Sequence, residues 1–420
     1  MKKLILFYSI LVLSTTSLVA QISANGTFLY LQNAYTLRNS DVMSYLIKEC
    51  NNYLVSFWDS PDADEVLFML GNLYEEEKMY PRAFLAYLKI KFVHPSSDRR
   101  NDSVSNLNQI VHNKAESTFR DKRKKIDELV SQTLSFTDRN TAYYDLIQFV
   151  YELNIEEMNE VLLNDIYFYT QIYSKDAKNP DQLYYWIGDL YKKLSDWHEA
   201  ILAYKKIQFI TPESILIPQA QFSIALLEYN ETDEYQKSKD TFIQLISSHP
   251  ELSIAADAQF YLAELYQEKL DNTNEAVSNY RILVESYPDS RLAVESLKRV
   301  GKIMEDNDNY EEAIASYHQI FELYPTNPYA PEALLEIESL YRRKLENYEK
   351  AIEVLKLYAN QFPEREDAAE RLFDAADLYK EELNNKQAAI DTYHEVINKF
   401  PNSKYAERSN DEIADLSGEN

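Results

Sequence analysis

Small, aromatic and aliphatic positions recur along this 420-residue chain at fixed offsets, with short polar segments between them. In three segments a glycine is followed by alanine at +12, tyrosine at +16 and isoleucine at +19; the glycines are Gly71, Gly188 and Gly301. Residues three or four apart share one face of a helix, so these offsets predict two apolar helices in each segment. The polar stretches KMY, LSDW and DNDNY lie between the two helices. Each segment is therefore predicted to be a helix–turn–helix, with helix A before the turn and helix B after it.

The small and large positions also predict how the two helices pack. Small residues at the glycine and alanine positions let the backbones approach, and the tyrosine four residues after the alanine fills the space between them. Tyrosine in place of phenylalanine suggests that its hydroxyl reaches a polar edge of the pair. The loops before Ala276, Ala351 and either Ala388 or Ala389 are expected to be one residue longer than the others.

A proline closes each segment at a nearly constant interval. The gaps between successive prolines are 37 or 38 residues, at Pro212, Pro250, Pro288, Pro325, Pro363 and Pro401. Proline lacks an N–H group and clashes with the preceding turn, so it ends helix B at the same place in every unit. A period of this size is the signature of a repeat array. The sequence predicts an all-α fold, a right-handed α-solenoid of about ten stacked helix pairs.

The repeat divides the chain into segments. Pro95 lies 117 residues before Pro212, close to three periods, which predicts two eroded units in between. The expected order is a signal peptide at 1–20, an N-terminal helical pair at 21–61, a clear repeat at 62–97, two degenerate helical repeats at 98–178, six repeats at 179–403, and a C-terminal capping helix with a loose tail at 404–420. The six repeats are 179–214, 215–252, 253–290, 291–327, 328–365 and 366–403.

The first twenty residues indicate export. Lys2 and Lys3 precede an apolar run from Leu4 to Leu13, and Ala20 is suited to cleavage before Gln21. The alternative is an uncleaved anchor, for which the apolar run is short. We therefore expect an exported, periplasmic chain, outer-membrane associated or secreted, with no transmembrane segment after cleavage.

The repeat resembles the tetratricopeptide repeat, whose pattern runs W-x2-L-G-x2-Y, then alanine, an aromatic residue and proline. Here Tyr184 takes the tryptophan position of the unit around Gly188. The longer period and phrases such as YPDSRLAVES are similar to an exported bacterial subgroup, that of the Tol-Pal cell-division coordinators and the outer-membrane assembly lipoproteins. The chain lacks the lipidated cysteine of the latter.

The resemblance implies a partner-binding surface on the concave face of helix A. Carried over to this chain, the positions are Tyr185, Asp189, Lys192, Lys193, Lys298, Lys302, Arg342, Arg343, Phe373 and Lys380. Cations at these places suit the carboxylate terminus or an acidic segment of a protein partner. The alternative is that long cationic side chains only make helix A soluble.

Charge and composition exclude other classes. The formal net charge of −26 repels nucleic-acid phosphates. The five glycines form no phosphate-binding loop, and the six histidines have no partner at metal-ligand spacing. No nucleophile motif is present either, so we predict no catalytic, metal or cofactor-binding residues and no enzyme. Cys50, the one cysteine, lies in an apolar helical phrase and is expected to be a buried, inert thiol rather than a reactive one.

Two further features have competing interpretations. The basic segment FRDKRKK at 119–125 is either a docking site for an acidic partner or lipid headgroup, or a solvated helix face. The 34 tyrosines and helix-A aromatics such as Tyr185, Phe260 and Phe373 suggest stacking on sugars, although many tyrosines fall at core positions. The expected function is a non-catalytic protein–protein interaction scaffold of the bacterial cell envelope; the alternative is an accessory protein that handles peptidoglycan or polysaccharide.

Overall fold

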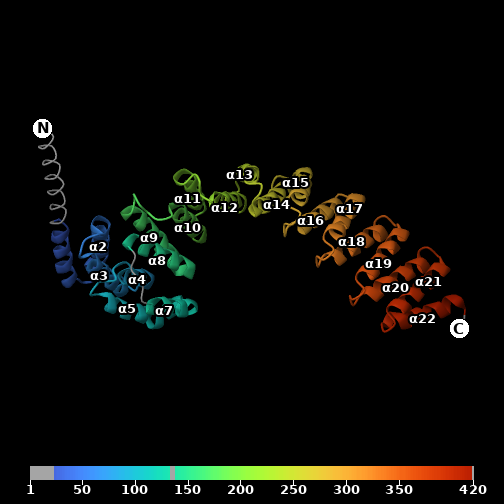
Figure 1. Cartoon of the computed structure of the whole chain (residues 1–420), viewed down its shortest axis with the longest axis horizontal. Coiled ribbons are helices and arrows are strands. Elements are labelled where there is room, and N and C mark those ends of the chain that lie inside the picture. The colour runs from blue at the N-terminus through green and yellow to red at the C-terminus, as the bar shows by residue number, and fades with distance from the viewer. Residues whose placement is uncertain (1–22, 133–137, 419–420) are drawn as a thin grey trace. The chain divides into compact units, whose positions relative to one another are not determined.

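The computed structural model describes residues 23–132 and 138–418, and over these ranges every regular element is a helix. The chain divides into two compact units, Met1–Ile224 and Ala225–Asn420. Within each unit consecutive helices pack as pairs (Figure 1). The all-α prediction is confirmed. The proposed signal peptide, residues 1–20, lies outside the described residues.

The first unit begins with helical residues 23–36 and η1 (Ser40–Val42). Its longer helices are α2 (Met43–Phe57), α3 (Ala63–Glu76), α4 (Tyr80–Val93), α5 (Arg100–Gln109), α7 (Arg123–Ser131), α8 (Arg139–Leu153), α9 (Asn159–Ile172), α10 (Pro180–Lys193), α11 (Trp197–Ile210) and α12 (Ile217–Asn230). Shorter turns are the π-helix η2 (Ile110–Lys114), α6 (Glu116–Phe119), η3 (Arg120–Lys122) and η4 (Glu156–Met158). The division between the units falls within α12.

The second unit is more regular. Its helices are α13 (Tyr235–Ser248), α14 (Ser253–Glu268), α15 (Thr273–Ser286), α16 (Ala293–Asp306), α17 (Tyr310–Leu323), α18 (Ala330–Arg343), α19 (Tyr348–Gln361), α20 (Ala368–Glu381), α21 (Lys386–Lys399) and α22 (Lys404–Ser417). Apart from α22, which touches both α20 and α21, each helix packs mainly on its neighbours in sequence. This is the contact pattern of a repeat array.

Proline sets the end of helix B throughout the array, as predicted. Helices α4, α11, α13, α15, α17, α19 and α21 each end two residues before the proline of their unit. The residue between helix and proline donates its backbone N–H to the carbonyl four residues earlier, for example Thr211 to Ile207 at 2.9 Å. The break therefore falls where the proline removes the next donor.

The turn between helix A and helix B has a left-handed residue of its own. The positive φ angles recur at Lys78, Ser195, Asp233, Asp271, Asp308, Glu346 and Asn384. After the left-handed residue the chain bonds back to helix A across either five residues, as in Asn309 N to Met304 O, or six, as in Asn272 N to Tyr266 O. The six-residue form occurs before Ala276, Ala351 and Ala389, which confirms the three longer loops, and also before Ser238, where Glu234 N bonds to Glu228 O.

The three repeat glycines lie against the helix-B tyrosines. A Cβ placed on Gly71, Gly188 or Gly301 would stand 2.6 Å from the ring of Tyr87, Tyr204 or Tyr317. No side chain fits at that distance unless the ring moves. The predicted packing of small residue against tyrosine is thus realised as direct contact between ring and backbone.

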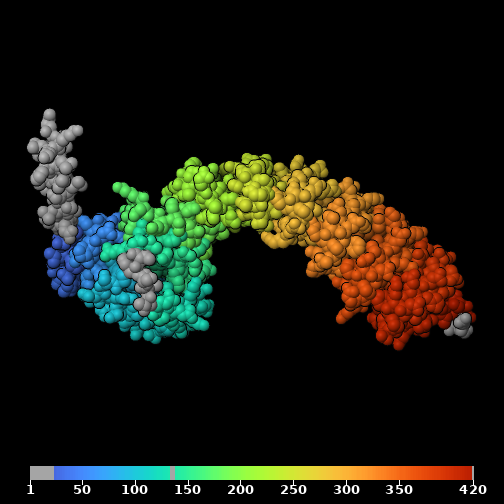
Figure 2. Space-filling view, in the orientation of Figure 1, coloured from blue at the N-terminus to red at the C-terminus, as the bar shows by residue number. Residues whose placement is uncertain are grey.

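Residues 98–178, predicted as two degenerate repeats, depart from packing between sequential neighbours. α8 contacts α4, and α9 contacts α2 as well as α10. The intervening segment from α5 to α7 includes the π-helical turn η2, and in Figure 2 its surface, in cyan and teal, forms one edge of the first unit. Because α9 returns to α2, this unit has an interior that the period alone does not describe.

Candidate functional site

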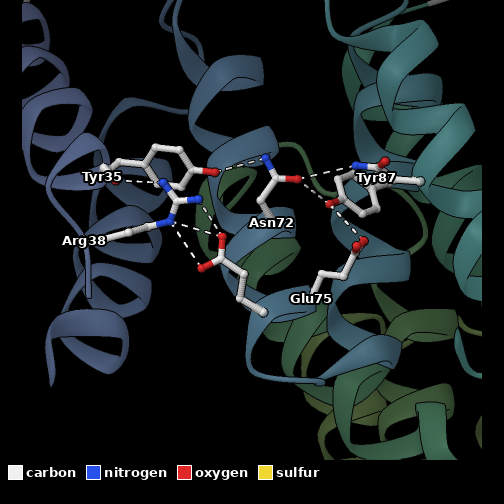
Figure 3. Close-up of polar contacts among 7 residues, drawn as sticks. Tyr35, Arg38, Asn72, Glu75 and Tyr87 are labelled. Carbon is white, nitrogen blue, oxygen red and sulfur yellow. Dashed lines mark hydrogen bonds and ion pairs between the residues drawn. The ribbon is translucent and has the colours of Figure 1, made fainter. Parts of the chain in front are cut away.

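Asn72, the residue after Gly71 on α3, joins helices on both sides of it (Figure 3). Its Nδ2 donates to the Tyr35 hydroxyl at 3.1 Å, and its Oδ1 accepts from the Tyr87 hydroxyl at 2.7 Å. Asn106 Nδ2, on α5, lies 3.4 Å from the same Oδ1. An amide is both donor and acceptor, so one side chain serves several helices.

Charged groups surround the hydrogen bonds that Asn72 makes with the neighbouring helices. Arg38 lies over the Tyr35 ring at 3.9 Å and donates to Glu76 at 2.6 Å (Figure 3). Glu75 accepts from the Tyr87 hydroxyl at 3.4 Å, and burial together with this carboxylate raises the pKa of Tyr87. The helix-A surface here is a connected polar network rather than a row of independent side chains.

Asp189 has the equivalent place on α10. It accepts from the Tyr151 hydroxyl at 2.5 Å and from the Tyr204 hydroxyl at 2.6 Å. Burial and the carboxylate raise the pKa of Tyr204. Tyr185 is half-buried, with its ring 5.4 Å from that of Tyr204. The structure thus gives Asp189 an intramolecular role that the sequence did not reveal, while its predicted partner contact stays a prediction.

The same hydrogen bond between a helix-A side chain and a helix-B tyrosine recurs on α20, where Asp377 accepts from the Tyr393 hydroxyl of α21. Asn72, Asp189 and Asp377 all follow the small residue of helix A, and the tyrosines are all on helix B. The expected polar edge for the repeat tyrosines is therefore present, at the position directly after the small residue.

Phe373 needs a correction. It is 1% exposed, and its ring packs 5.2 Å from Tyr393 and 5.5 Å from Tyr405. Phe260 is also buried, 5.4 Å from the Tyr280 ring. Neither ring is available to a protein partner or a sugar. The sequence placed them on helix A correctly but on the wrong face, because these phenylalanines, three positions before the small residue, point into the pair.

The predicted cations of α10 differ in their surroundings. Lys192 is exposed and lies 3.8 Å from Asp189. Lys193 donates to Asn154 Oδ1 at 2.7 Å and lies over the Tyr151 ring at 5.1 Å. Burial lowers the pKa of Lys193. Both lysines are exposed, and Lys193 differs from Lys192 in its bond to Asn154.

Lys298 and Lys302 of α16 are paired within their own helix. Lys298 Nζ is 3.7 Å from Glu295, and Lys302 Nζ is 3.2 Å from Asp306 and 3.5 Å from Glu305. The pairing raises the pKa of Lys302. Exposed pairs of this kind contribute about 0–1 kcal/mol, so they are easily exchanged for other carboxylates.

The remaining predicted cations are on α18 and α20. Arg342 Nε is 2.7 Å from Glu338, whose burial raises its pKa, while Arg343 is exposed. Lys380 donates to Glu412 of α22 at 2.9 Å. Lys380 therefore ties the terminal helix to the array.

The basic segment 119–125 is partly built into the first unit. Phe119 is buried with its ring 4.6 Å from Phe84. Arg123 pairs with Glu116 at 3.2 Å and Lys125 with Glu152 at 3.6 Å. Arg123 and Lys125 are thus paired within the chain, and a docking role for the segment stays a prediction.

Sequence reasoning missed a buried polar cluster beneath α9. Lys89 Nζ donates to Asp165 Oδ1, which also accepts from the Tyr143 hydroxyl at 2.9 Å. Trp58 stacks on Tyr143 at 5.3 Å, and its Nε1 donates to the Tyr173 hydroxyl at 3.0 Å. A signal existed: lysines at 89 and 91 interrupt an apolar helix-B phrase, YLKIKFV. Buried charges of this kind require partners.

Two further titratable groups of the first unit are buried. Burial raises the pKa of the Cys50 thiol to about 12, so it remains protonated, as expected for an inert cysteine. Burial, with Arg139 adding to it, lowers the pKa of His94 to about 4. His94 therefore stays neutral against the edge of Trp58 at neutral pH.

Within residues 23–132 and 138–418, no helix combines the length and apolar character needed to cross a membrane. Likewise, nowhere in those ranges do three or more His, Cys, Asp or Glu side chains gather in a metal-binding arrangement.

Comparison with known proteins identifies the repeat. Family models described as tetratricopeptide repeat match residues 181–212, 257–290 and 372–403. No curated protein sequence matches the chain.

Several solved structures are similar to it. The apo form of RapI is 11% identical with a TM-score of 0.41, covering 90% of this chain and 97% of its own. The C-terminal part of a TPR repeat-containing protein from Cytophaga hutchinsonii is 16% identical with a TM-score of 0.38, covering 64% and 99%. MamA from Desulfovibrio magneticus RS-1 is 15% identical with a TM-score of 0.34, covering 46% and 99%.

Stacked helix pairs with a constant period define this chain as an all-α repeat protein. Three of its helix pairs, in residues 181–212, 257–290 and 372–403, match tetratricopeptide repeat models, in agreement with the predicted resemblance. Repeat arrays of this class present extended binding surfaces and act in general as interaction scaffolds.

Proposed function

We propose that this chain is a non-catalytic protein–protein interaction scaffold of the bacterial cell envelope, exported by its N-terminal segment and binding partner segments along helix A. The observation that carries the proposal is the presence of half-exposed or exposed cations on three A helices, α10, α16 and α18. Lys192, Lys302 and Arg343 are all exposed on a chain of net charge −26. Acidic partner segments are the complementary ligand.

The local ion pairs support this role. Lys192 and Lys302 pair with acids three or four residues away on the same helix. Since such surface pairs contribute about 0–1 kcal/mol, a partner carboxylate can replace the local one at little cost. Partner binding is then expected to weaken as ionic strength rises.

The alternative, peptidoglycan or polysaccharide handling, loses most of its basis. It rested on helix-A aromatics, and of these Phe260 and Phe373 are buried. Tyr185 alone keeps a half-exposed ring.

Charge reversal on α16 tests the proposal. Lys298→Glu with Lys302→Glu should reduce recovery of cross-linked partners from envelope extracts at least ~10-fold, since like charges then face the acidic segment. Lys124→Glu, in the basic segment 119–125, is the matched control because Lys124 is 91% exposed and lies outside this surface. Recovery no better than background with the unmodified chain would refute the scaffold; equal loss in the control would refute the surface.

Cell fractionation tests the location. The mature chain is expected in the periplasmic or outer-membrane fraction, and its N-terminal sequence should begin near Gln21. Recovery of the uncleaved chain from the cytosol would refute export.

A further inference from the structure

A cavity of about 340 Å³ in the first unit, partly open to solvent, is lined by residues of α2, α3, α4 and α9. Each of the four helices contributes polar side chains to the lining, and the apolar part includes four leucines and Phe168. The polar lining residues are Asn51, Tyr74, Arg82, Lys89, Asn164 and Asp165. A volume of this size is at the lower end of the range for ligand pockets, so the cavity suits a small molecule with both polar and apolar surface.

Asp165 has one carboxylate oxygen in use and one without a partner. The Lys89 ammonium and the Tyr143 hydroxyl both donate to Oδ1, the hydroxyl at 2.9 Å. Oδ2 is buried on a side chain that is 5% exposed, and it has no hydrogen-bond partner among the described residues. Asp165 is the only lining residue in the described part of the chain with such an atom. Since buried polar atoms are paired as a rule, Oδ2 indicates a ligand group that donates a hydrogen bond.

Lys89 supplies donors next to this acceptor. An ammonium has three N–H groups, and the hydrogen bond to Asp165 Oδ1 occupies one of them. Lys89 Nζ also lies 5.0 Å from the centre of the Phe168 ring, which lines the cavity as well. One ligand oxygen can therefore accept from Lys89 while a neighbouring hydroxyl group donates to Asp165.

The charges of the cavity favour a neutral ligand. Lys89 and Asp165 neutralise each other, whereas Arg82 pairs with Glu160 at 3.1 Å and bonds the Tyr74 hydroxyl. An ammonium group on Asp165 would bring a second buried cation beside Lys89, and a carboxylate would be repelled by Asp165. A hydroxyl group donates its hydrogen bond without adding charge.

We propose that this cavity binds a small neutral polyol of monosaccharide size through two adjacent hydroxyl groups. One hydroxyl donates to Asp165 Oδ2, and the oxygen of the next accepts from Lys89 Nζ. The C–H surface of the molecule packs on the leucines and Phe168. The inference goes beyond the scaffold function, and it does not involve the helix-A aromatics Phe260 and Phe373.

Isothermal titration calorimetry on the full chain tests the class of ligand, with glucose, mannose, galactose and myo-inositol as probes. At least one of them should bind with a dissociation constant in the millimolar range or tighter. Cyclohexanol should bind at least ~10-fold more weakly, because its single hydroxyl cannot bond Asp165 and Lys89 together. If none of the four polyols binds, Asp165 Oδ2 holds water only and the proposal is wrong. Tighter binding of ethylamine or acetate than of every polyol also overturns it.

Two variants locate the bound polyol. Lys89→Met with Asp165→Leu removes both charges together, so neither is left buried and unpaired, and the fold should persist. Val161→Trp keeps the ion pair and fills the cavity. Each variant should weaken polyol binding at least ~10-fold while circular dichroism shows a folded chain. Polyol binding that survives in either folded variant overturns the proposal.

The matched control removes an ion pair of the second unit. Lys356 and Glu395 lie 3.0 Å apart, and Lys356→Met with Glu395→Leu should bind the polyol as the unmodified chain does. An equal loss in this control would refute the assignment to the cavity. Since calorimetry with polyols measures no protein partner, the cavity proposal and the scaffold proposal can fail separately.

Discussion

In each glycine-containing repeat a tyrosine ring lies directly on the glycine backbone. The rings of Tyr87, Tyr204 and Tyr317 leave no room for a Cβ, and two of their hydroxyls reach the side chain that follows the glycine. One residue thus fills the core and satisfies a polar group at its edge. Where alanine replaces the glycine, as at Ala263 and Ala376, the turn is one residue longer and the tyrosine comes one position later.

Gly188→Ala should destabilise the chain by about 1–3 kcal/mol because the new methyl group overlaps the Tyr204 ring. Urea unfolding measures the loss. Gly26→Ala is the matched control: nothing lies within 4 Å of its Cβ, and alanine favours the helix, so stability should stay equal or rise by up to about 1 kcal/mol. An equal change in the free energy of unfolding for Gly188→Ala and Gly26→Ala would contradict a close contact between Gly188 and the Tyr204 ring.

His94 predicts a pH dependence. Its folded pKa of about 4 lies below the ordinary value of 6.5, so the unfolded chain binds the proton more readily between these values. Stability is unaffected above pH 6.5 and falls as the pH drops toward 4, by an amount on the order of 3 kcal/mol. Unfolding measured from pH 7 to 4 should show a shallower decline in His94→Gln than in the unmodified chain. His198→Gln, at an exposed position, is the control and should decline like the unmodified chain. If stability falls equally steeply with pH in His94→Gln and in the unmodified chain, His94 is not the cause.

At the scale of helices, two features together define each repeat: the turn after helix A and the proline after helix B. The left-handed residue lets the chain reverse after helix A, and the proline stops helix B. None of the seven left-handed turn residues is glycine, so each carries conformational strain.

Ser195, with φ of 63°, tests this strain. Ser195→Gly should leave stability unchanged or raise it by up to about 1 kcal/mol, whereas Ser195→Val should lower it by about 1–2 kcal/mol because a β-branched residue resists positive φ. Thermal unfolding compares the two. The exposed neighbour site His198→Val, in the first turn of α11, controls for an added apolar side chain. A stable Ser195→Val variant would show that the turn is not constrained.

On the scale of the whole molecule, most contacts in the second unit are between consecutive helices, so damage should remain local. α22 closes this unit: Tyr405 packs on Phe373, and Glu412 accepts from Lys380. That α22 serves as a capping helix stays a prediction.

Deleting residues 404–420 should raise amide hydrogen exchange in α20 and α21 at least ~10-fold, because Phe373 and Tyr393 lose their cover. Exchange in α3 and α4 of the first unit should not change. As a control, Lys404→Gln keeps α22 and should leave exchange in both regions as it was. Faster exchange throughout the chain would contradict the view that each helix is stabilised mainly by its neighbours in sequence.

The sequence by itself determined the repeat, its helix ends, the longer turns and the pairing of small residue with tyrosine, because these follow from local periodicity and proline stereochemistry. Only the tertiary structure decided that Phe373 is core, that Asp189 bonds two tyrosines, and that α9 folds back on α2. Lys89 and Asp165 are 76 residues apart, and no periodic pattern specifies their contact. The cavity depends on that fold-back, so its residues had no signature along the chain beyond two lysines in an apolar helix.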